Sequence, residues 1–454
     1  MNTFIDSFMT LNDKKKPLQS INRILKAAMD AADPIRVIER SIKLDEKRLQ
    51  AGNKTFLLYP DSRIIVIAIG KACLDMSSGA FNILGNRISG GVAVCKHNPE
   101  KIGRIGNMDV ITGSHPVPDQ SSINAAIQIK KILSSVKDRD VVLLLISGGG
   151  SALVCLPAPN IDIEDMQAVT GALLKSGASI NELNAVRKHL DLIKGGGLLK
   201  MAAPAQVGAL VISDVVNDPL DVIASGPAVP DPTSFSDAKT VLEKYIGLQD
   251  VPCSIIKRIE AGCRNEIEDT LKPEDPLASF AEHTIIASNK LSAQAACEQA
   301  FREGFESEII TYDLVGEART AGGYLAGLVK RKNPSKRPYI GIAGGETTVV
   351  VKGKGLGGRN LEVALGAVKD LDGLENCMLI TLATDGEDGP TDAAGAYVTG
   401  QTLSTAKNLG LDPDVYLDNN DAYHFFEKAG GLINTGPTGT NVNDLSFIIR
   451  LPED

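Results

Sequence analysis

Short glycine-rich loops follow several apolar segments of this 454-residue chain, and they are the first places where chemistry is expected. The clearest is SGGGS at 147–151, directly after the apolar run VVLLLI at 141–146. Glycines at such a turn let backbone N–H groups approach an oxyanion such as a phosphate. The loop lacks the Gly-Lys-Ser/Thr ending of a Walker A motif. A tight strand-to-helix turn is the alternative, but a turn alone rarely needs three glycines, so the pattern favours an anion cradle.

Two further apolar runs are followed by charged residues. Lys71 comes after IIVIAI at 64–69 and can project over the edge of a sheet toward a ligand, or it can be a solvated lysine in a turn. Asp214 and Asp218 come after VGALVI at 207–212. Carboxylates there suit Mg²⁺, which takes a few oxygen ligands and keeps several waters, or they form turns and helix caps. The residues alone leave both alternatives open at each place.

The segment VVVKGKGLGGRN at 349–360 contains a literal GxGxxG at Gly353, Gly355 and Gly358. A strand is expected at 378–382, and Asp385 lies near its end, where a dinucleotide-binding fold keeps its ribose-binding acid. The segment therefore supports a dinucleotide site as one interpretation.

Two observations favour a more general anion site at this segment. We expect 347–352 to be the second arm of a hairpin that begins at 339–343, and not the first strand of a βαβ unit. Asp385 lies 27 residues after Gly358, longer than the usual ~20. Arg359 at the start of a helix suits an anion through its bidentate guanidinium.

An acidic loop and two histidines complete the candidates. The loop TDGEDGPTD at 384–392 lacks the ligand spacing of an EF-hand, so Mg²⁺ or hydroxyl binding and a plain turn-rich loop both stay open. His115 and His189 lie near the glycine loops, and His189 is expected to be structural. The side chains of Asn184, Arg187 and Lys188, on the same expected helix as His189, face either solvent or a phosphate. No HExxH or GxSxG occurs, which gives zinc-protease and hydrolase functions little support.

The elements that must position these residues follow an α/β pattern. Near-continuous apolar runs at 64–69, 141–146 and 207–212 are typical of strands buried on both faces of a parallel sheet, and helical segments lie between them. The acidic stretch at 268–276 contains two prolines and marks a boundary between domains 1–275 and 276–454. After it we expect strands and helices to alternate again, at 283–287, 291–303, 308–312 and 317–330.

Composition excludes several classes of function. The net charge of −9 argues against nucleic acid as a partner, because phosphate neutralisation needs a basic face. Seven scattered cysteines without a CxxC pair are typical of a reducing compartment. The start shows no secretory signal, and no apolar run could span a membrane. We therefore expect a cytoplasmic protein with small-molecule partners, no nucleic acid and no membrane; a homodimer is compatible with the sequence, which does not settle the oligomeric state.

Taken in order, these motifs resemble the glycerate 2-kinase family (class II glycerate kinases), and the C-terminal part resembles the MOFRL domain of that family. The resemblance runs from about Leu18 to Ile449. It rests on IGKA at 69–72, HPVPD at 115–119, SGGGSAL at 147–153, NAVRKHLDLIKGGGL at 184–198, SDVVNDPLDVIASGP at 213–227, GGETTVVVKGKGLGGRN at 344–360, TDGEDGPTDAAGA at 384–396 and TGPTGTNVNDL at 435–445.

The resemblance implies ATP- and Mg²⁺-dependent phosphorylation of D-glycerate at its 2-hydroxyl, giving 2-phosphoglycerate and ADP. It also implies two α/β domains around an active-site cleft, an N-terminal domain with a Rossmann-like parallel sheet flanked by helices and a C-terminal domain with a mixed sheet. Lys71 and Arg359 match the residues proposed as catalytic in that family. On the matching motifs we expect the nucleotide phosphates at Ser147, Gly148, Gly149, Gly150, Ser151, Lys194 and Gly195, the substrate at His115, Asn217, Glu346, Asn360 and Asp388, and the metal near Asp214 or Asp385.

Two positions depart from the family pattern. Asn217 stands where the family often has glycine, and Leu361 stands where a glutamine is common. Phosphoryl transfer stays the expected reaction, while the acceptor is D-glycerate or a close relative such as a longer aldonic acid. The alternatives are an NAD(P)-dependent hydroxypyruvate reductase, which draws on the GxGxxG, and a non-catalytic nucleotide sensor.

Overall fold

The computed structural model describes residues 15–96, 103–333 and 335–453, and the chain divides into two compact units. One unit is Pro34–Ile286, and the other combines Met1–Asp33 with Ala287–Asp454. This division differs from the predicted boundary at 275/276 in two ways. Strand β10 (Ala281–Ala287) belongs to the first sheet, and helix α2 (Lys15–Asp30) packs against a helix of the second unit.

A seven-stranded sheet forms the centre of the Pro34–Ile286 unit, with strand order β10-β9-β8-β4-β5-β7-β6. Strands β9, β8, β4, β5 and β7 are mutually parallel, and β6 is antiparallel to β7. The predicted buried strands at 64–69, 141–146 and 207–212 are confirmed as β4, β8 and β9. The sheet strands are β4 (Ile64–Ile69), β5 (Ile88–Lys96), β6 (Gly103–Ile105), β7 (Met108–Gly113), β8 (Val141–Ile146) and β9 (Gln206–Ile212).

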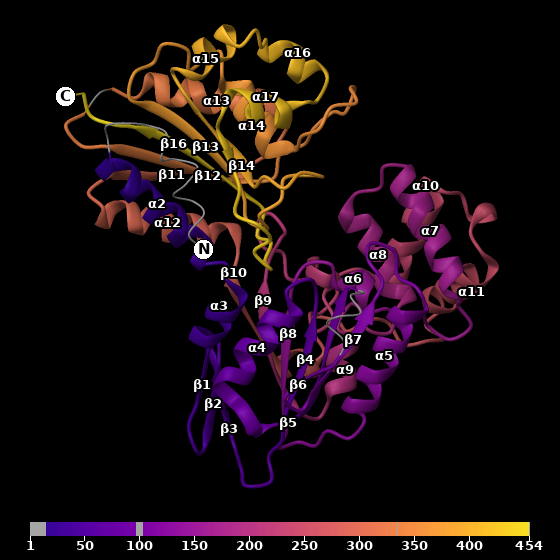
Figure 1. Ribbon diagram of the computed structural model, residues 1–454. Coiled ribbons are helices and arrows are strands. Elements are labelled where there is room, and N and C mark those ends of the chain that lie inside the picture. The colour runs from indigo at the N-terminus through magenta and orange to yellow at the C-terminus, as the bar shows by residue number, and fades with distance from the viewer. Residues whose placement is uncertain (1–14, 97–102, 334, 454) are drawn as a thin grey trace. The chain divides into compact units, whose positions relative to one another are not determined.

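Helices cover both faces of this sheet (Figure 1). On one face, apolar residues of α5 and α9 share a core with alternate residues of the strands, such as Ile65, Ile67 and Ile69. Helix α4, supported by α3, contacts β4 and β5, and a small antiparallel sheet of β1, β2 and β3 lies in the same unit. The elements are α3 (Pro34–Ser41), β1 (Ile42–Leu44), β2 (Arg48–Ala51), β3 (Lys54–Leu57), α4 (Cys73–Leu84), α5 (Gln120–Leu133), α6 (Gly150–Leu153) and α9 (Gly197–Ala202).

Four further helices of this unit gather into a cluster of their own, visible in Figure 1. Their apolar faces share a separate core that includes Met166, Leu183 and Phe235. Helix α8 begins with a capping box, in which Ser179 and Glu182 satisfy each other's backbone N–H groups. The cluster consists of α7 (Ile163–Lys175), α8 (Ile180–Leu190), α10 (Phe235–Tyr245) and α11 (Cys253–Cys263).

The other unit is built on a six-stranded mixed sheet with strand order β11-β12-β16-β13-β14-β15. Strand β16 is antiparallel to both of its neighbours, and its first residue, Asp444, pairs with Gly345 at the end of β12 and with Ala383 at the end of β13. Residues that follow β12 and β13 therefore lie beside Asp444. The strands are β11 (Glu306–Leu314), β12 (Tyr339–Gly345), β13 (Cys377–Ala383), β14 (Gly395–Thr399), β15 (Leu432–Ile433) and β16 (Asp444–Arg450).

Two helix layers enclose the mixed sheet (Figure 1). Helices α2 and α12 share one core with Ile340, Ile380 and Phe447, and helices α13 and α14 share the opposite core with Leu379 and Ile448. The mixed sheet between helices agrees with the expected second domain. The helices of this unit besides α2 are α12 (Asn289–Arg302), α13 (Ala318–Arg331), α14 (Arg359–Ala367), α15 (Thr402–Asn408), α16 (Pro413–Asp418) and α17 (Ala422–Ala429).

The predicted hairpin between 339–343 and 347–352 is wrong. Strand β12 pairs with β11 and β16, and residues 346–358 form an irregular segment. Val350 and Val351 in this segment are exposed, so their β-branched side chains pack in no sheet.

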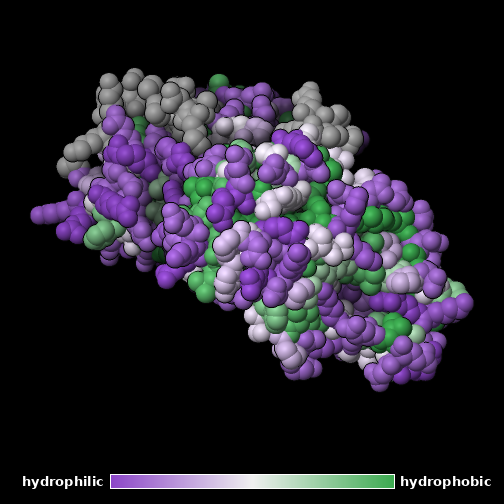
Figure 2. Space-filling view, turned by 90° about the horizontal axis from the view of Figure 1, so that it is seen from below, coloured by the Kyte–Doolittle hydropathy of each residue, from purple (hydrophilic) through white to green (hydrophobic). Residues whose placement is uncertain are grey.

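The helices of the described residues include no candidate membrane span. No helix among these residues is long and apolar enough to cross a bilayer. On the face drawn in Figure 2, hydrophobic residues lie in small groups among hydrophilic ones. The seven cysteines are all free thiols.

Close packing of α13 on α14 depends on a glycine and provides a test of this unit. A Cβ at Gly322 would lie 2.0 Å from the carbonyl oxygen of Val363, whereas at Gly327 the nearest atom would be Arg331 Nη1 at 3.5 Å. We expect Gly322→Ala to lower the free energy of unfolding by about 1–3 kcal/mol through overpacking. Gly327→Ala should raise it by up to about 1 kcal/mol, because alanine favours a helix. Urea unfolding followed by circular dichroism checks both, and a Gly322→Ala protein as stable as the unchanged chain would contradict the packing.

Candidate active site

The carboxyl ends of five parallel strands meet at one edge of the sheet in the Pro34–Ile286 unit. From β4 the chain goes on to β5 and β7, and it then returns to place β8 on the other side of β4. In open α/β sheets, ligands bind outside the carboxyl ends of the strands where the order reverses in this way. Lys71 follows β4 and the loop 147–151 follows β8, so the structure brings these two predicted sites together at the switch point.

The loop at 147–151 presents backbone N–H groups that no described residue accepts. Ser147 donates its N–H to the carbonyl of Ile69 at 2.9 Å, and its Oγ accepts the N–H of Ala72 at 3.0 Å, which fixes the loop on β4. The next four N–H groups, at 148–151, donate to none of the residues that the structure describes. Four open amides at the start of a helix have the arrangement expected of an anion cradle.

Lys71 and His115 flank Gly149 in this cradle. A Cβ at Gly149 would lie 3.1 Å from His115 Cδ2 and 3.4 Å from Lys71 Cε. Lys71 is exposed, and its Nζ has no hydrogen bond or ion pair with any described residue. Burial, together with the charges of Lys71 and Lys96, lowers the pKa of His115. His115 is therefore neutral near pH 7, and the positive charge beside the cradle belongs to the lysines.

Asp214, the second residue after β9, lies against the cradle. A Cβ at Gly148 would be 1.8 Å from Asp214 Oδ2, so glycine is needed where this carboxylate approaches. Asn217 is exposed further along the same loop. No group of three or more His, Cys, Asp or Glu side chains that could hold a metal occurs within 15–96, 103–333 and 335–453. A single carboxylate beside the cradle suits a cation that keeps several of its waters, as Mg²⁺ does.

Lys194 and Gly195 have partners within the protein. The Lys194 ammonium is buried and forms an ion pair with Asp191, and it also donates to the carbonyl of Val154 at 3.4 Å. The N–H of Gly195 donates to the carbonyl of Ser225 at 3.0 Å. These contacts hold both residues in the fold, and Lys194 also lines a cavity beside the cradle.

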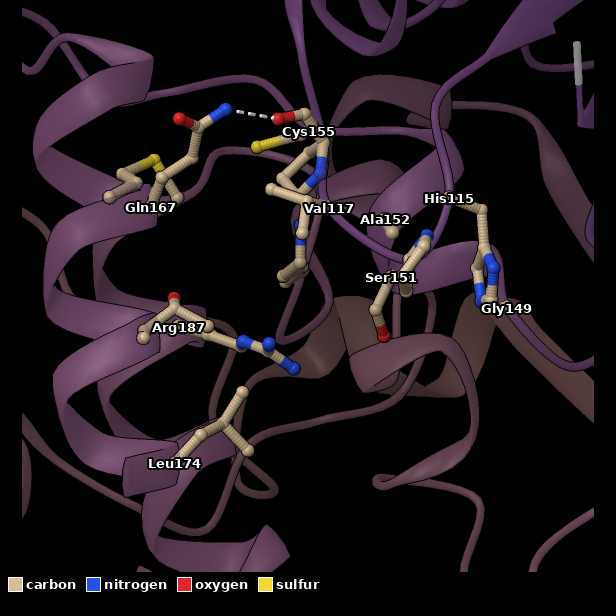
Figure 3. Close-up of a pocket in the computed structure, with 15 residues that line it drawn as sticks. His115, Val117, Gly149, Ser151, Ala152, Cys155, Gln167, Leu174 and Arg187 are labelled. Atoms are coloured by element: carbon tan, nitrogen blue, oxygen red, sulfur yellow. Dashed lines mark hydrogen bonds between the residues drawn. The ribbon is translucent and has the colours of Figure 1, made fainter. Parts of the chain in front are cut away.

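A cavity of about 330 Å³ lies between the cradle and the helix cluster (Figure 3). Its walls come from the loop at 115–118, the segment around Gly149–Cys155 and one side of α7. Gln167 on α7 donates to the carbonyl of Pro118 at 2.6 Å, which ties the helix to the loop. Arg187 on α8 extends its guanidinium into this space (Figure 3).

In the other unit, two carboxylates hold Arg359 at the start of α14. Asp444 accepts hydrogen bonds from Nε and from Nη2, the latter at 3.3 Å, and Glu346 accepts from Nη1 at 2.5 Å. Burial lowers the pKa of Arg359, but the two carboxylates outweigh it and raise the pKa above its ordinary value. A guanidinium has five N–H groups, so two stay open for a ligand anion.

Asp388, predicted as a substrate ligand, is instead buried beneath the first turn of α14. It accepts the backbone N–H groups of Asn360 at 3.0 Å and Leu361 at 2.7 Å, and the side-chain amide of Asn360 at 3.3 Å. Burial raises the pKa of Asp388 to about 6, while these N–H groups oppose the shift. Leu361 is fully buried in the apolar core, so its departure from the family pattern faces away from the Arg359 site.

The glycines of the GxGxxG segment serve chain packing. The N–H groups of 352–356 all donate to residues 419–421, at 2.8 to 3.2 Å. At Gly353 or Gly355, a Cβ would lie within 2.3 Å of the same segment. Five consecutive amides of this segment, 352–356, are therefore already bonded within the protein and are not open to a dinucleotide pyrophosphate.

Asp385 follows β13 in the same unit. Its Oδ2 accepts from Asn441 Nδ2 at 3.2 Å and its Oδ1 from the N–H of Glu387 at 3.3 Å. Asp385 and Asp214 lie in different compact units, so each is described with its own neighbours. His189 is buried and bonded to Asp269 at 2.9 Å, in keeping with its expected structural role.

Two charged residues were missed by the sequence analysis or left open there. Asp444 lies in the last of the quoted motifs, but the sequence does not show that its strand is central to a sheet. For Arg187, the sequence analysis left open whether the side chain faces solvent or a phosphate. The available signal was its spacing of three residues from Asn184, which puts both side chains on one face of α8.

Replacement of Gly148 tests the cradle. Gly148→Ala places a methyl group on the Asp214 carboxylate and narrows the space in front of the open amides. We expect ATP affinity, measured by titration calorimetry, to fall at least about tenfold. A decrease of this size corresponds to the loss of one charge-assisted hydrogen bond. Gly90→Ala in β5 is the matched control, because nothing lies within 4 Å of its Cβ. Unchanged affinity in Gly148→Ala would place the phosphates elsewhere.

Comparison with known proteins agrees with these motifs. A family model described as a domain of unknown function (DUF4147) matches residues 20–260, and the MOFRL family model matches residues 339–444. A protein from Pyrococcus horikoshii named glycerate 2-kinase is 42% identical over 94% of this chain and 96% of its own. A D-glycerate 2-kinase from Thermotoga maritima is 42% identical over 91% of this chain and 98% of its own.

Two further matches bear on the alternatives. A putative hydroxypyruvate reductase from Agrobacterium vitis is 36% identical over 97% of this chain and 96% of its own. A crystal structure of glycerate kinase from Thermotoga maritima superposes with a TM-score of 0.85 at 40% identity, covering 95% of this chain and 99% of that one. On these identities, with both family regions present in order, the chain belongs to the glycerate 2-kinase family, with a C-terminal MOFRL region.

Proposed function

We propose that this chain is a glycerate 2-kinase, which transfers a phosphoryl group from ATP to the 2-hydroxyl of D-glycerate and releases ADP and 2-phosphoglycerate. The observation that carries the proposal is the open cradle at 148–151 beside Lys71, at the switch point of a parallel sheet. The chain also shares 42% of its residues with two relatives that are named for this activity.

The chemistry of phosphoryl transfer matches what these residues supply. The reaction needs little covalent help from the protein; it needs cations near the transferring group and an oriented hydroxyl. In our proposal the amides at 148–151 hold the ATP phosphates, and Lys71 and Arg359 act as the catalytic cations. One of the two neutralises the transferring phosphoryl group, and the other holds the carboxylate of glycerate. Because they lie in different units, a shared active site between the units stays a prediction.

Mg²⁺ is the proposed metal, with Asp214 as its protein ligand. The fit rests on the donor chemistry, since a partly buried carboxylate beside phosphate-binding amides is the usual protein contribution to a magnesium–nucleotide site. When bound, Mg²⁺ would neutralise charge on the phosphate oxygens. Asp385 stays a candidate ligand from the other unit.

The structure weakens the argument for the reductase alternative, which rested on the GxGxxG motif. The N–H groups of 353–356 donate to residues 419–421, so a dinucleotide could reach those four amides of the GxGxxG only by displacing these hydrogen bonds. On the sequence grounds given above, we propose that the enzyme acts on small molecules in the cytoplasm, and a homodimer stays a prediction.

The direct test is ADP release in a coupled assay with ATP, Mg²⁺ and D-glycerate, with phosphorus NMR to identify the product. We expect 2-phosphoglycerate, and loss of turnover when EDTA removes the metal. A 3-phosphoglycerate product would keep the kinase and contradict its regiochemistry. Oxidation of NADH or NADPH with hydroxypyruvate, without ADP release, would support the reductase.

Lys71 and Arg359 are tested by substitutions matched to their contacts. Lys71 has no partner among the described residues, so Lys71→Met should leave the melting temperature unchanged and lower kcat/KM by about 10²-fold or more, as loss of a transition-state charge does. Arg359→Lys keeps a cation near Asp444 but loses the bidentate guanidinium, and we expect a similar decrease in kcat/KM.

Arg319→Lys is the control for Arg359→Lys. Arg319 forms an ion pair with Glu362 at 3.1 Å in the same unit and lies outside the proposed site. Its replacement should leave kcat/KM within about twofold, because a rate effect needs contact with the reacting groups. Near-normal activity in both Lys71→Met and Arg359→Lys would refute the assignment of the catalytic cations.

A further inference from the structure

The guanidinium of Arg187 has no anionic partner among the described residues. Its guanidinium lines the cavity beside the cradle, and it has no hydrogen bond or ion pair with any residue in the described part of the chain. Burial lowers its pKa, and the neighbouring thiol of Cys155 is too weak an acid to compensate. A partly buried guanidinium that lines a cavity without a carboxylate partner is well placed for an external anion.

A second donor on the same helix face also lacks a partner. Asn184 lies one turn before Arg187, and its Nδ2 is buried with no hydrogen-bond acceptor. Its Oδ1 accepts from Ser225 Oγ at 3.0 Å, and Ser225 Oγ lies 2.7 Å from Ser151 Oγ in the cradle loop. These hydrogen bonds connect α8 to Ser151, which lines the cavity within the cradle loop.

The cavity also has an apolar wall that is exposed to solvent. Val117 and Leu174 line it, yet they are 52% and 57% exposed, and Met166 and Ala152 contribute further apolar surface. A volume of about 330 Å³ falls in the range of small-molecule sites, roughly 300–1,000 Å³. The space thus offers an apolar wall together with the Arg187 guanidinium and the open amides of the cradle.

We infer that this cavity holds the phosphoryl-donor nucleotide, with Arg187 bound to its phosphates and the Val117–Leu174 wall against its base. The inference rests on the proposed function for the identity of the ligand. It goes further by assigning a subsite and a binding residue that the catalytic pair does not include. D-Glycerate is small and wholly polar, so it would leave the apolar wall uncovered.

Titration calorimetry with two ligands separates the charged contact of the cavity from its apolar contacts. Arg187→Met removes the charge and keeps an unbranched apolar stem, and we expect it to weaken both ATP and inorganic tripolyphosphate about 10- to 100-fold. Leu174→Ser removes apolar surface only, and it should weaken ATP several-fold while tripolyphosphate affinity stays unchanged. Lys175→Met is the matched control: it removes one positive charge from the exposed end of the same helix cluster, and both affinities should stay within about twofold.

The melting temperature and the KM values of Arg187→Met test the inference further. Arg187→Met should melt no lower than the unchanged protein, because no ion pair is lost. Its KM for ATP should rise while its KM for D-glycerate stays within about twofold. Unchanged ATP affinity in Arg187→Met, a selective rise in the KM for D-glycerate, or no ATP binding by the unchanged protein would each overturn the inference. If the unchanged protein binds ATP but does not phosphorylate D-glycerate, and Arg187→Met still loses ATP affinity, the proposed function fails and the nucleotide subsite stands.

Discussion

A carboxylate that packs against a glycine just before a helix is the contact on which both units depend. In the Pro34–Ile286 unit, Gly148 admits Asp214 after the neighbouring strand, and in the other unit Gly358 admits Asp388 in the same manner. Any side chain at either glycine would displace the carboxylate. The two contacts nevertheless differ in whether the backbone N–H groups at the helix start have an acceptor. Asp388 accepts the N–H groups of α14 directly, whereas the amides at 148–151 are accepted by no described residue.

This difference assigns separate tasks to the two helix starts. At α14 the protein supplies its own anion, so the helix is held rigidly and Arg359 is presented from its first residue. At the cradle no described residue accepts the amides, so the anion that they would hold comes from a ligand. The cations follow the same division: Arg359 is bound by Asp444 and Glu346, while Lys71 and Arg187 have no carboxylate partner among the described residues. A chain of net charge −9 thus keeps unpaired positive charge where a polyphosphate would bind.

The sequence predicted those features that depend on local pattern. Continuous apolar runs identified the buried strands β4, β8 and β9, and because parallel strands end at one edge, the structure brings the loops after β4 and β8 together. The hairpin failed because the partner of β12 is β16, which lies about a hundred residues further along the chain and carries no local signal. Asp388 was expected at the substrate from the family motif, and the sequence does not show that this carboxylate accepts the N–H groups at the start of α14. Arg187 was left open because its significance is the lack of a partner, which only the structure shows.

The literal GxGxxG at 353–358 shows why a glycine pattern does not by itself identify a ligand. Glycine permits any close approach of backbone, and the approach here is to residues 419–421, whose oxygens take each N–H from 352 to 356. A dinucleotide would have to displace all of these hydrogen bonds to reach the amides, and each lost bond leaves a donor unsatisfied. The loop at 147–151 has fewer glycines and matches no fingerprint, yet its amides are open. The availability of the N–H groups, and not the spacing of the glycines, therefore favours phosphoryl transfer over hydride transfer in this chain.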